Sequence, residues 1–256
     1  MTAPFFSIVT VVRNAEGELR ATSSSLSAQD FRDFEWVIID GASSDGTRRF
    51  AEEQFERGAA TGVSEPDRGI YDAMNKGLER AKGEYVLFLN AGDCLLDANS
   101  LGTVSEALHH SGLPDVGFFG SIMDFGTRRI VRRTKSPAYI WHGQPSLHQA
   151  TFVRKELHKK VPFSLKYKIV GDYEALARMR MRGATMRSFP QIIGINTFEA
   201  SSVSGRQKML LIKDAATIQR EVLGLSTWWI LVSVARRAIN SLVVKVFTAT
   251  RSRGGY

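Results

Sequence analysis

The stretch that decides the fold runs Ser64-Glu-Pro-Asp-Arg-Gly-Ile-Tyr-Asp-Ala-Met-Asn-Lys-Gly77 and resumes as Gly83-Glu-Tyr-Val-Leu-Phe-Leu-Asn-Ala-Gly-Asp93. After a polar turn, small and apolar side chains at three- and four-residue spacing predict a helix over 69–81. The second part predicts a buried strand over 84–89 that ends in an acidic loop. The carboxyl end of such a strand is where open α/β sheets bind ligands.

The same alternation of strands and helices extends upstream of this stretch. The sequence predicts strands at 6–12, 35–40 and 61–64, and helices at 16–29 and 47–57. This order predicts a parallel, doubly wound sheet. Downstream, the sequence predicts strands at 116–121 and 130–133, a loop at 136–149, a helix at 172–182, and two strands within 185–198 that are interrupted by Pro190.

Composition narrows the class of protein. With 256 residues, of which 43% are hydrophobic and 23% charged, the chain fits a soluble domain with room for an extension. The apolar run at 5–12 lacks a basic lead and a cleavage site, so no signal peptide is predicted. The single cysteine, Cys94, excludes an internal disulfide and suits a reducing cytoplasm. Beside Asp93 its thiolate is disfavoured, which predicts a packing role.

The positive charge lies in the last fifth of the chain. Residues 1–205 carry 25 Lys and Arg against 24 Asp and Glu, whereas residues 206–256 carry 9 against 2. Small polar residues at 201–206 mark the boundary, so we expect a main domain over 1–205 and a helical, basic extension over 206–256. A basic tail on a near-neutral domain favours an anionic membrane surface as partner and argues against nucleic acid.

The tail contains an amphipathic segment at 225–247. Its apolar face is predicted to comprise Trp228, Leu231, Val232, Ala235, Ile239, Leu242, Val243 and Val246. Arg236 and Arg237 argue against an ordinary transmembrane span. The paired tryptophans predict a helix that lies in the membrane interface. The alternative is a helix packed on the main domain or on a second subunit.

The opening stretch, together with Val37-Ile-Ile-Asp-Gly-Ala-Ser-Ser-Asp-Gly46, resembles the family-2 glycosyltransferases of the GT-A fold over residues 5–206. Within that family it is most similar to enzymes of bacterial surface-polysaccharide and glycolipid assembly. The resemblance implies a Rossmann-like, mostly parallel twisted sheet flanked by helices. It also implies inverting transfer of a sugar from a nucleotide-diphosphate donor to an acceptor hydroxyl on a polysaccharide precursor or lipid-linked glycan. Such an enzyme would lie peripherally on the inner face of the cell membrane.

Donor binding is expected at the ends of the first strands. The resemblance assigns the nucleotide sugar to Thr10, Arg13, Asn14, Asp40, Asp45, Asp67, Arg68 and Asn90. A carboxylate such as Asp40 can accept from a base N–H or a ribose hydroxyl. Family members often carry two adjacent acids where this chain has Asp40-Gly41, so base selectivity is not predicted. The alternatives are local turn chemistry at Asp40 and Asp45 and a helix N-cap at Asp67.

A divalent cation, Mn²⁺ or Mg²⁺, is the cofactor that the resemblance implies. Asn90-Ala-Gly-Asp93 occupies the place of the family's DxD-type motif, with Asp93 as its one carboxylate. An asparagine carbonyl is still a hard oxygen ligand, and cations shared with substrate phosphates need only one or two protein carboxylates. The alternative is that Asp93 caps the turn.

Asp172, in Lys168-Ile-Val-Gly-Asp-Tyr-Glu174, matches the family's general base. One carboxylate suffices to take the proton of the attacking hydroxyl, because the leaving group needs no acid partner. The alternative is an ordinary N-cap aspartate. His148 is expected either to contact the acceptor or metal, or to be a structural histidine.

Two other functions remain open from the sequence. Nucleotidyl transfer can use a similar sheet, but Thr10-Val-Val-Arg-Asn14 is not the Gly-rich, basic phosphate loop it usually shows. The thinned metal motif also allows a catalytically degenerate, membrane-associated binding protein. Processive synthesis is not expected, because the chain has no Gln-x-x-Arg-Trp sequence.

Overall fold

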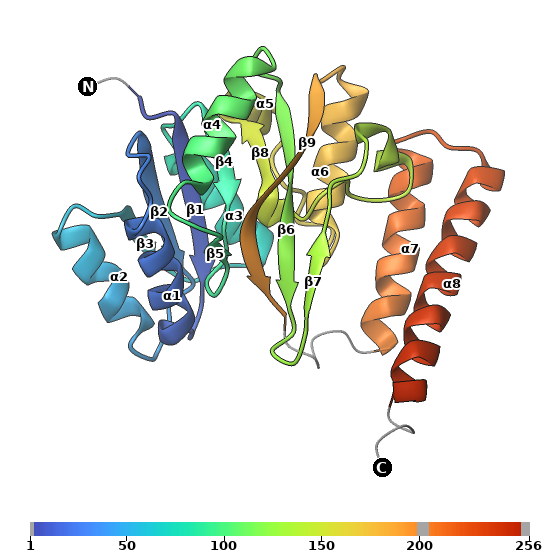
Figure 1. Cartoon of the computed structure of the whole chain (residues 1–256), viewed down its shortest axis with the longest axis horizontal. Coiled ribbons are helices and arrows are strands. Elements are labelled where there is room, and N and C mark those ends of the chain that lie inside the picture. Colours follow the sequence, from blue (N-terminus) through green and yellow to red (C-terminus); the bar gives the residue numbers. More distant parts are fainter. Residues whose placement is uncertain (1–2, 199–204, 252–256) are drawn as a thin grey trace.

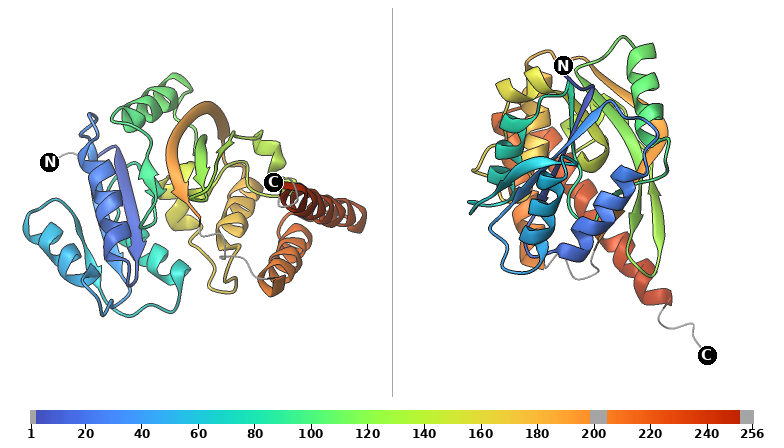
Figure 2. Two further views of the ribbon diagram at one scale, coloured as in Figure 1. Left: turned by 60° about the horizontal axis from the view of Figure 1, so that its bottom comes forward. Right: turned by 90° about the vertical axis from the view of Figure 1, so that its left-hand side faces the viewer.

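A nine-stranded sheet in the order β3-β2-β1-β4-β8-β6-β9-β5, with β7 paired to β6, forms the centre of the molecule (Figure 1). The computed structural model describes residues 3–198 and 205–251. Helices cover both faces of the sheet, and the last two helices form a hairpin at one side (Figure 2).

The first half of the sheet is parallel, as predicted. It comprises β1 (Phe6–Val12), β2 (Phe34–Asp40), β3 (Thr61–Ser64) and β4 (Tyr85–Phe88), connected by α1 (Glu16–Ser27), α2 (Thr47–Glu56) and α3 (Ile70–Arg80). Each bound lies within two residues of its prediction. Gly77 lets α3 approach the sheet, because an added Cβ would lie 2.3 Å from Cγ1 of Val9. The parallel register pairs Val12 with Asp40 and Asp40 with Ser64, so polar groups gather at one edge.

The second half is mixed. It contains β5 (Cys94–Leu95), α4 (Ser100–His110), β6 (Val116–Asp124), β7 (Arg129–Arg132), β8 (Thr151–Arg154), α5 (Lys155–Lys160), α6 (Gly171–Met181) and β9 (Met186–Thr197), with 3₁₀ turns at Pro137–Trp141 and His148–Ala150. β8 runs antiparallel to both β4 and β6. The parallel pairing predicted for the first strands therefore does not extend to this half, which gives the sheet as a whole a mixed character. The loop before β8 lies at the edge where β4 ends, so β8 must run back.

The sequence predicted that Pro190 would divide the last segment into two strands, but the structure has a single strand there. β9 continues through Pro190 and pairs with β6 on both sides, from Ser188 to Ile192. The register shifts between these two residues. A proline without an N–H is tolerated where the ladder is already interrupted by an irregularity.

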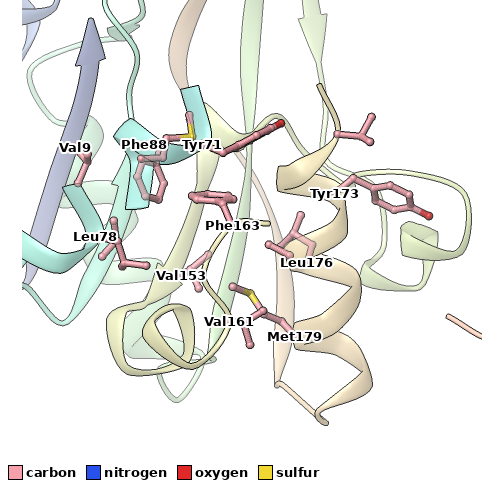
Figure 3. Close-up of a cluster of buried hydrophobic side chains, with 14 of the residues drawn as sticks. Val9, Tyr71, Leu78, Phe88, Val153, Val161, Phe163, Tyr173, Leu176 and Met179 are labelled. Carbon is pink, nitrogen blue, oxygen red and sulfur yellow. The ribbon is translucent and has the colours of Figure 1, made fainter. Parts of the chain in front are cut away.

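Two apolar layers hold the sheet between its helices. In one of them Tyr71, Phe88 and Phe163 stand between α3, β4 and α6, with Leu176 and Met179 of α6 closing the layer (Figure 3). This layer fixes α3 and α6 against the same strand edge.

The predicted extension forms α7 (Gly205–Glu221) and α8 (Thr227–Arg251), which lie antiparallel beside α6 (Figures 1 and 2). Buried polar contacts join it to the domain, since His142 hydrogen-bonds to the Ser233 hydroxyl at 2.8 Å and the Gln219 side-chain amide donates to the Trp141 carbonyl at 3.0 Å. Ser233 is fully buried. Across residues 3–198 and 205–251, no helix combines the length and apolar character that a membrane crossing requires.

The outer face of α8 is apolar in the part with described side chains. Trp228 is 70% exposed and Leu231 57%, with Trp229 and Ile239 also more than half exposed. Leu242, Val243 and Val246 lie outside the residues whose side chains are described. The alternative of a helix packed on the main domain therefore holds for one face of α8, whereas the predicted apolar face points outward.

Candidate active site

Asp40 organises the turn after β2. It is fully buried, and its carboxylate accepts hydrogen bonds from the Ser43 amide at 3.1 Å, the Ser43 hydroxyl and the Ser64 hydroxyl. The sequence predicted that this carboxylate would contact the donor. The structure brings it to the predicted edge, with three of its acceptor positions filled by the protein itself.

Of the other residues predicted to bind the donor nucleotide sugar, Asn14 and Asp45 lie at the carboxyl edge of the sheet, whereas Thr10 lies inside the sheet layer. Asn14 has a positive φ of 50°, and its side-chain oxygen accepts from the Ser44 amide at 2.8 Å. Asp45 is exposed and accepts from the Thr47 amide, and the Thr47 hydrogen bonds lower the pKa of Asp45. Thr10 lies within the sheet layer, where its hydroxyl accepts from the Trp36 indole at 2.9 Å.

A pocket opens between the end of β1 and the start of α3. Its volume is about 270 Å³, and its lining includes Arg13, Asp67 and Ile70. Asp67 is held by Lys76, whose Nζ lies 2.6 Å from it and 2.9 Å from Glu65. Lys76 thus neutralises two carboxylates at the pocket wall.

The first turn of α3 rules out the alternative that Asp67 is its N-cap. Gly69, with φ of 129°, occupies the N-cap position, and Asp67 does not cap the helix. Asp72 instead accepts from the Arg68 amide at 3.0 Å and from the Arg68 guanidinium at 2.9 Å. The exposed Arg68 side chain is therefore tied to the helix in this structure.

Asn90 and Asp93 form the turn after β4, where the Asp93 amide donates to the Asn90 carbonyl at 3.0 Å. The side-chain Oδ1 of Asn90 is buried without a hydrogen-bond partner, whereas Asp93 accepts from the Thr197 amide at 3.2 Å. Burial raises the pKa of Asp93, although the charge of His148 acts against it. Burial also raises the pKa of Cys94, which confirms that its thiolate is disfavoured.

The donor set of this turn fits a small hard cation. It offers one carboxylate, on Asp93, and the amide oxygen of Asn90 that no protein donor uses. Oxygen atoms of this kind bind Mg²⁺ or Mn²⁺ when substrate phosphates and water complete the shell. No group of three or more His, Cys, Asp or Glu side chains suited to a metal occurs among residues 3–198 and 205–251.

Asp172 and His148 meet at the junction of α6 with the loop before β8. Oδ2 of Asp172 lies 3.2 Å from Nδ1 of His148, and Nε2 of His148 lies 3.1 Å from the side-chain Nδ2 of Asn90. Oδ1 accepts from the Tyr173 amide at 2.8 Å and faces the Tyr71 hydroxyl at 3.4 Å. This chain of contacts joins the predicted base to the predicted metal turn.

Electrostatics keep Asp172 ionised. Burial by itself would raise the pKa of this carboxyl, but the hydrogen bond and charge of His148 bring it below its ordinary value, with help from Gln144. An ionised carboxylate can accept the proton of a hydroxyl that binds beside it.

Sequence reasoning missed several amide and hydroxyl groups in the second half of the sheet. Buried side-chain atoms without a hydrogen-bond partner occur on Ser121, Gln144, Gln149 and Asn196. Gln149 and Asn196 also lower the pKa of Asp93, so they lie beside it. Gln149 directly follows His148, which is the one signal that could have pointed to it.

Comparison with known proteins identifies the class. The family model described as "Glycosyl transferase family 2" matches residues 7–180. A glycosyltransferase of PGL/p-HBAD biosynthesis from Mycobacterium bovis is 30% identical over 208 residues, covering 75% of this chain and 76% of that protein.

Solved structures share the fold. TarS 1–349 of S. aureus, in complex with UDP-GlcNAc, gives a TM-score of 0.68 at 18% identity over 93% of this chain and 72% of that chain. The mannosyltransferase PcManGT of Pyrobaculum calidifontis, in complex with GDP-Man and Mn²⁺, gives 0.65 at 16% identity over 98% of this chain and 80% of that one.

The fold is therefore that of the GT-A glycosyltransferases, a mixed α/β sheet with flanking helices. The chain belongs to glycosyl transferase family 2. It is a nucleotide-sugar-dependent glycosyltransferase.

Proposed function

We propose that this enzyme transfers a sugar with inversion from a nucleotide-diphosphate donor to a hydroxyl of a polysaccharide precursor or glycolipid. The contact between His148 and Asp172 carries the proposal, because it supplies an ionised carboxylate at the strand edge. The mycobacterial relative is named for PGL/p-HBAD biosynthesis, which supports an acceptor of this class.

In the proposed reaction, Asp172 takes the proton of the acceptor hydroxyl while the hydroxyl oxygen attacks the anomeric carbon. The bond from that carbon to the diphosphate oxygen breaks, and the nucleoside diphosphate leaves with the electron pair. His148 holds the Asp172 carboxylate through Nδ1 and so fixes its orientation. A single carboxylate is sufficient, since the diphosphate needs no general acid.

Donor binding is proposed for the pocket of Arg13, Asp67 and Gly69, beside the turn that Asp40 organises. Asp93 and Asn90 would hold a divalent cation. The cation, when bound, would neutralise charge that develops on the leaving diphosphate. The donor-binding roles expected of Thr10, Asn14, Asp45 and Arg68 remain part of this proposal.

Membrane attachment is proposed for the outward face of α8, with Trp228 and Leu231 entering the headgroup region. Apolar side chains that remain exposed after the helix has packed on the domain support this assignment. The division into a transferase domain over 1–205 and an attachment element over 206–256 follows from it.

Two measurements test the proposed function. Thermal unfolding with UDP, GDP, CDP and dTDP, each with and without Mn²⁺, should show a raised melting temperature for one nucleotide. A ligand at ~100 times its dissociation constant adds about 2.7 kcal/mol of stability. Transfer from the matching sugar nucleotide to membrane lipid extracts should then require Asp172. Nucleotide binding without any transfer would favour the degenerate binding protein.

A further inference from the structure

The strand β7 and its flanks form a basic strip that the donor and acceptor roles leave unused. Residues 128–135 contain five basic side chains and no acidic one, namely Arg128, Arg129, Arg132, Arg133 and Lys135. Two apolar residues interrupt them, Ile130 at 42% exposure and Val131 at 50%. We call residues 128–135 the β7 strip.

The β7 strip lies at an edge of the sheet. β7 pairs with β6 alone among the described strands, from Ser121 with Arg132 to Asp124 with Arg129. Arg129 is partly neutralised by Asp124 at 2.9 Å, and Arg132 turns inward toward the Gln144 carbonyl. Arg128 and Arg133 are exposed and have no acidic partner among the described side chains.

A charged edge also prevents sheets from pairing with one another, which is a simpler role for this strip. It would explain the arginines. It would not explain Ile130 and Val131, which add exposed apolar area to an edge that pairing would exploit. Exposed apolar side chains flanked by basic ones instead suit a surface that lies against anionic lipid, because apolar burial and attraction to the headgroups act together.

The β7 strip continues into the exposed side of α8. The ring of Tyr139 lies 3.8 Å from Nζ of Lys135 and 5.7 Å from the guanidinium carbon of Arg236. The β6–β7 turn and the C-terminal end of α8 point toward the same pole of the molecule in Figures 1 and 2. At this pole the strands β1 and β2 end, so the site and both basic elements share it.

We propose that the β7 strip is a second contact with anionic lipid, which acts together with α8 to turn the strand edge that carries the site toward the headgroups. This inference rests on the proposed membrane-borne acceptor. A second copy of the chain is a poor occupant, because two strips would bring like charges together. Nucleic acid is also disfavoured, since the aromatic rings beside the strip are already engaged: Phe125 is stacked on Phe198 at 5.5 Å, and the Tyr139 ring lies 3.8 Å from Nζ of Lys135.

The test compares two double variants of equal charge change in the full-length chain. Arg128→Glu with Arg133→Glu alters the β7 strip, whereas Arg57→Glu with Arg182→Glu alters exposed arginines at the ends of α2 and α6. Partition is measured by co-sedimentation with vesicles of phosphatidylcholine alone and of phosphatidylcholine with phosphatidylglycerol. Each lost cation should weaken partition about fivefold and each added carboxylate should weaken it further, so we expect a loss of at least about 25-fold for the β7 variant.

The expected pattern is wild-type binding that requires phosphatidylglycerol, that weakens with salt, and that the control pair retains. Equal binding by the β7 variant and the control would overturn the inference and leave the role of α8 intact. Absence of wild-type binding would overturn both membrane contacts, while nucleotide-dependent stabilisation would still support the transferase site.

Two further measurements separate other causes. If the β7 variant unfolds, Arg128→Gln with Arg133→Gln should still lose about 25-fold, because the same two cations are removed. Sedimentation velocity tests whether the strip binds a second copy of the chain instead of lipid. If the wild type is a dimer, the β7 variant is a monomer and vesicle binding is unchanged, the lipid assignment is overturned.

Discussion

The two halves of the candidate site differ in how far the protein satisfies its own polar groups. On the donor side, Asp40 is bonded to Ser43 and Ser64, and Asp67 to Lys76. On the other side, buried polar atoms without partners occur on Asn90, Gln149 and Asn196. Unpartnered buried polar groups cost free energy unless something else satisfies them. The protein therefore satisfies the polar groups of the donor side by itself. On the metal and acceptor side, ligand groups are expected to complete the hydrogen bonding.

The largest effect is expected from Asp172→Asn, which removes the proposed proton acceptor on the metal and acceptor side. Transfer should fall about 10³-fold, or about 4 kcal/mol, within the usual range for a general base. Nucleotide-induced stabilisation should persist, because the donor pocket is untouched. The measurement is single-turnover transfer beside a thermal shift with the nucleotide. Retention of a tenth or more of the wild-type rate would remove Asp172 from this role.

The second effect concerns acid stability and lies beneath the same side of the site. His158 is almost fully buried against Phe88 and Phe163, and this burial lowers its pKa to about 4. The unfolded chain binds the proton near pH 6.5, so it holds more protons than the folded chain between pH 6.5 and 4. Stability should therefore fall by about 3 kcal/mol as the pH is lowered through this window.

His158→Leu tests this assignment through urea unfolding at pH 7 and at several points down to pH 4. The pH-dependent loss should shrink by about 3 kcal/mol, whatever the variant costs at pH 7. His110→Leu is the control, because His110 is exposed at the end of α4. An unchanged slope in His158→Leu would assign the acid sensitivity elsewhere.

The third effect concerns the hydrogen bonds that Asp40 accepts on the donor side. Asp40→Ala should lower the free energy of unfolding by about 2–3 kcal/mol, since it leaves the buried Ser43 amide and the hydroxyl of Ser64 without their acceptor. Asp45→Ala, on the exposed side of the same turn, should cost much less. Urea unfolding of both variants gives the comparison. If the stability is unchanged but nucleotide binding is lost, Asp40 contacts the donor directly.

The donor side is also the part of the molecule whose secondary structure the sequence predicts best. Its strands and helices are regular, and their periodicity is local, so the bounds of β1, β2 and β3 lie within one residue of the prediction. Elements such as β5, with two residues, carry no readable period. β8 follows a loop without periodicity, so its reversed direction depends on contacts distant in the sequence.

The same reason limits prediction of the site. The donor, metal and base roles of Asp40, Asp93 and Asp172 are predicted because the stretches that contain them resemble motifs of family-2 glycosyltransferases. The partners that set their chemistry are remote: His148 lies 24 residues before Asp172, and Thr197 lies 104 residues after Asp93. Thr10 is predicted from its motif to bind the donor at the edge of the sheet. In the structure its side chain lies inside the sheet layer, where its hydroxyl accepts a hydrogen bond from the Trp36 indole.

The smallest effect sharpens the comparison most, because it tests a residue that acts through another. In His148→Leu, transfer should fall about 10- to 30-fold, or about 1.4–2 kcal/mol, as Asp172 loses its orienting contact. The pKa of Asp172 should also rise, because His148 contributes to lowering it. The acidic limb of the pH–rate profile should therefore shift to higher pH, with activity lost earlier as the pH falls. His109→Leu, at the end of α4 and far from this contact in the sequence, serves as the control. A lower rate with an unmoved acidic limb would mean that His148 contacts the acceptor rather than positioning Asp172.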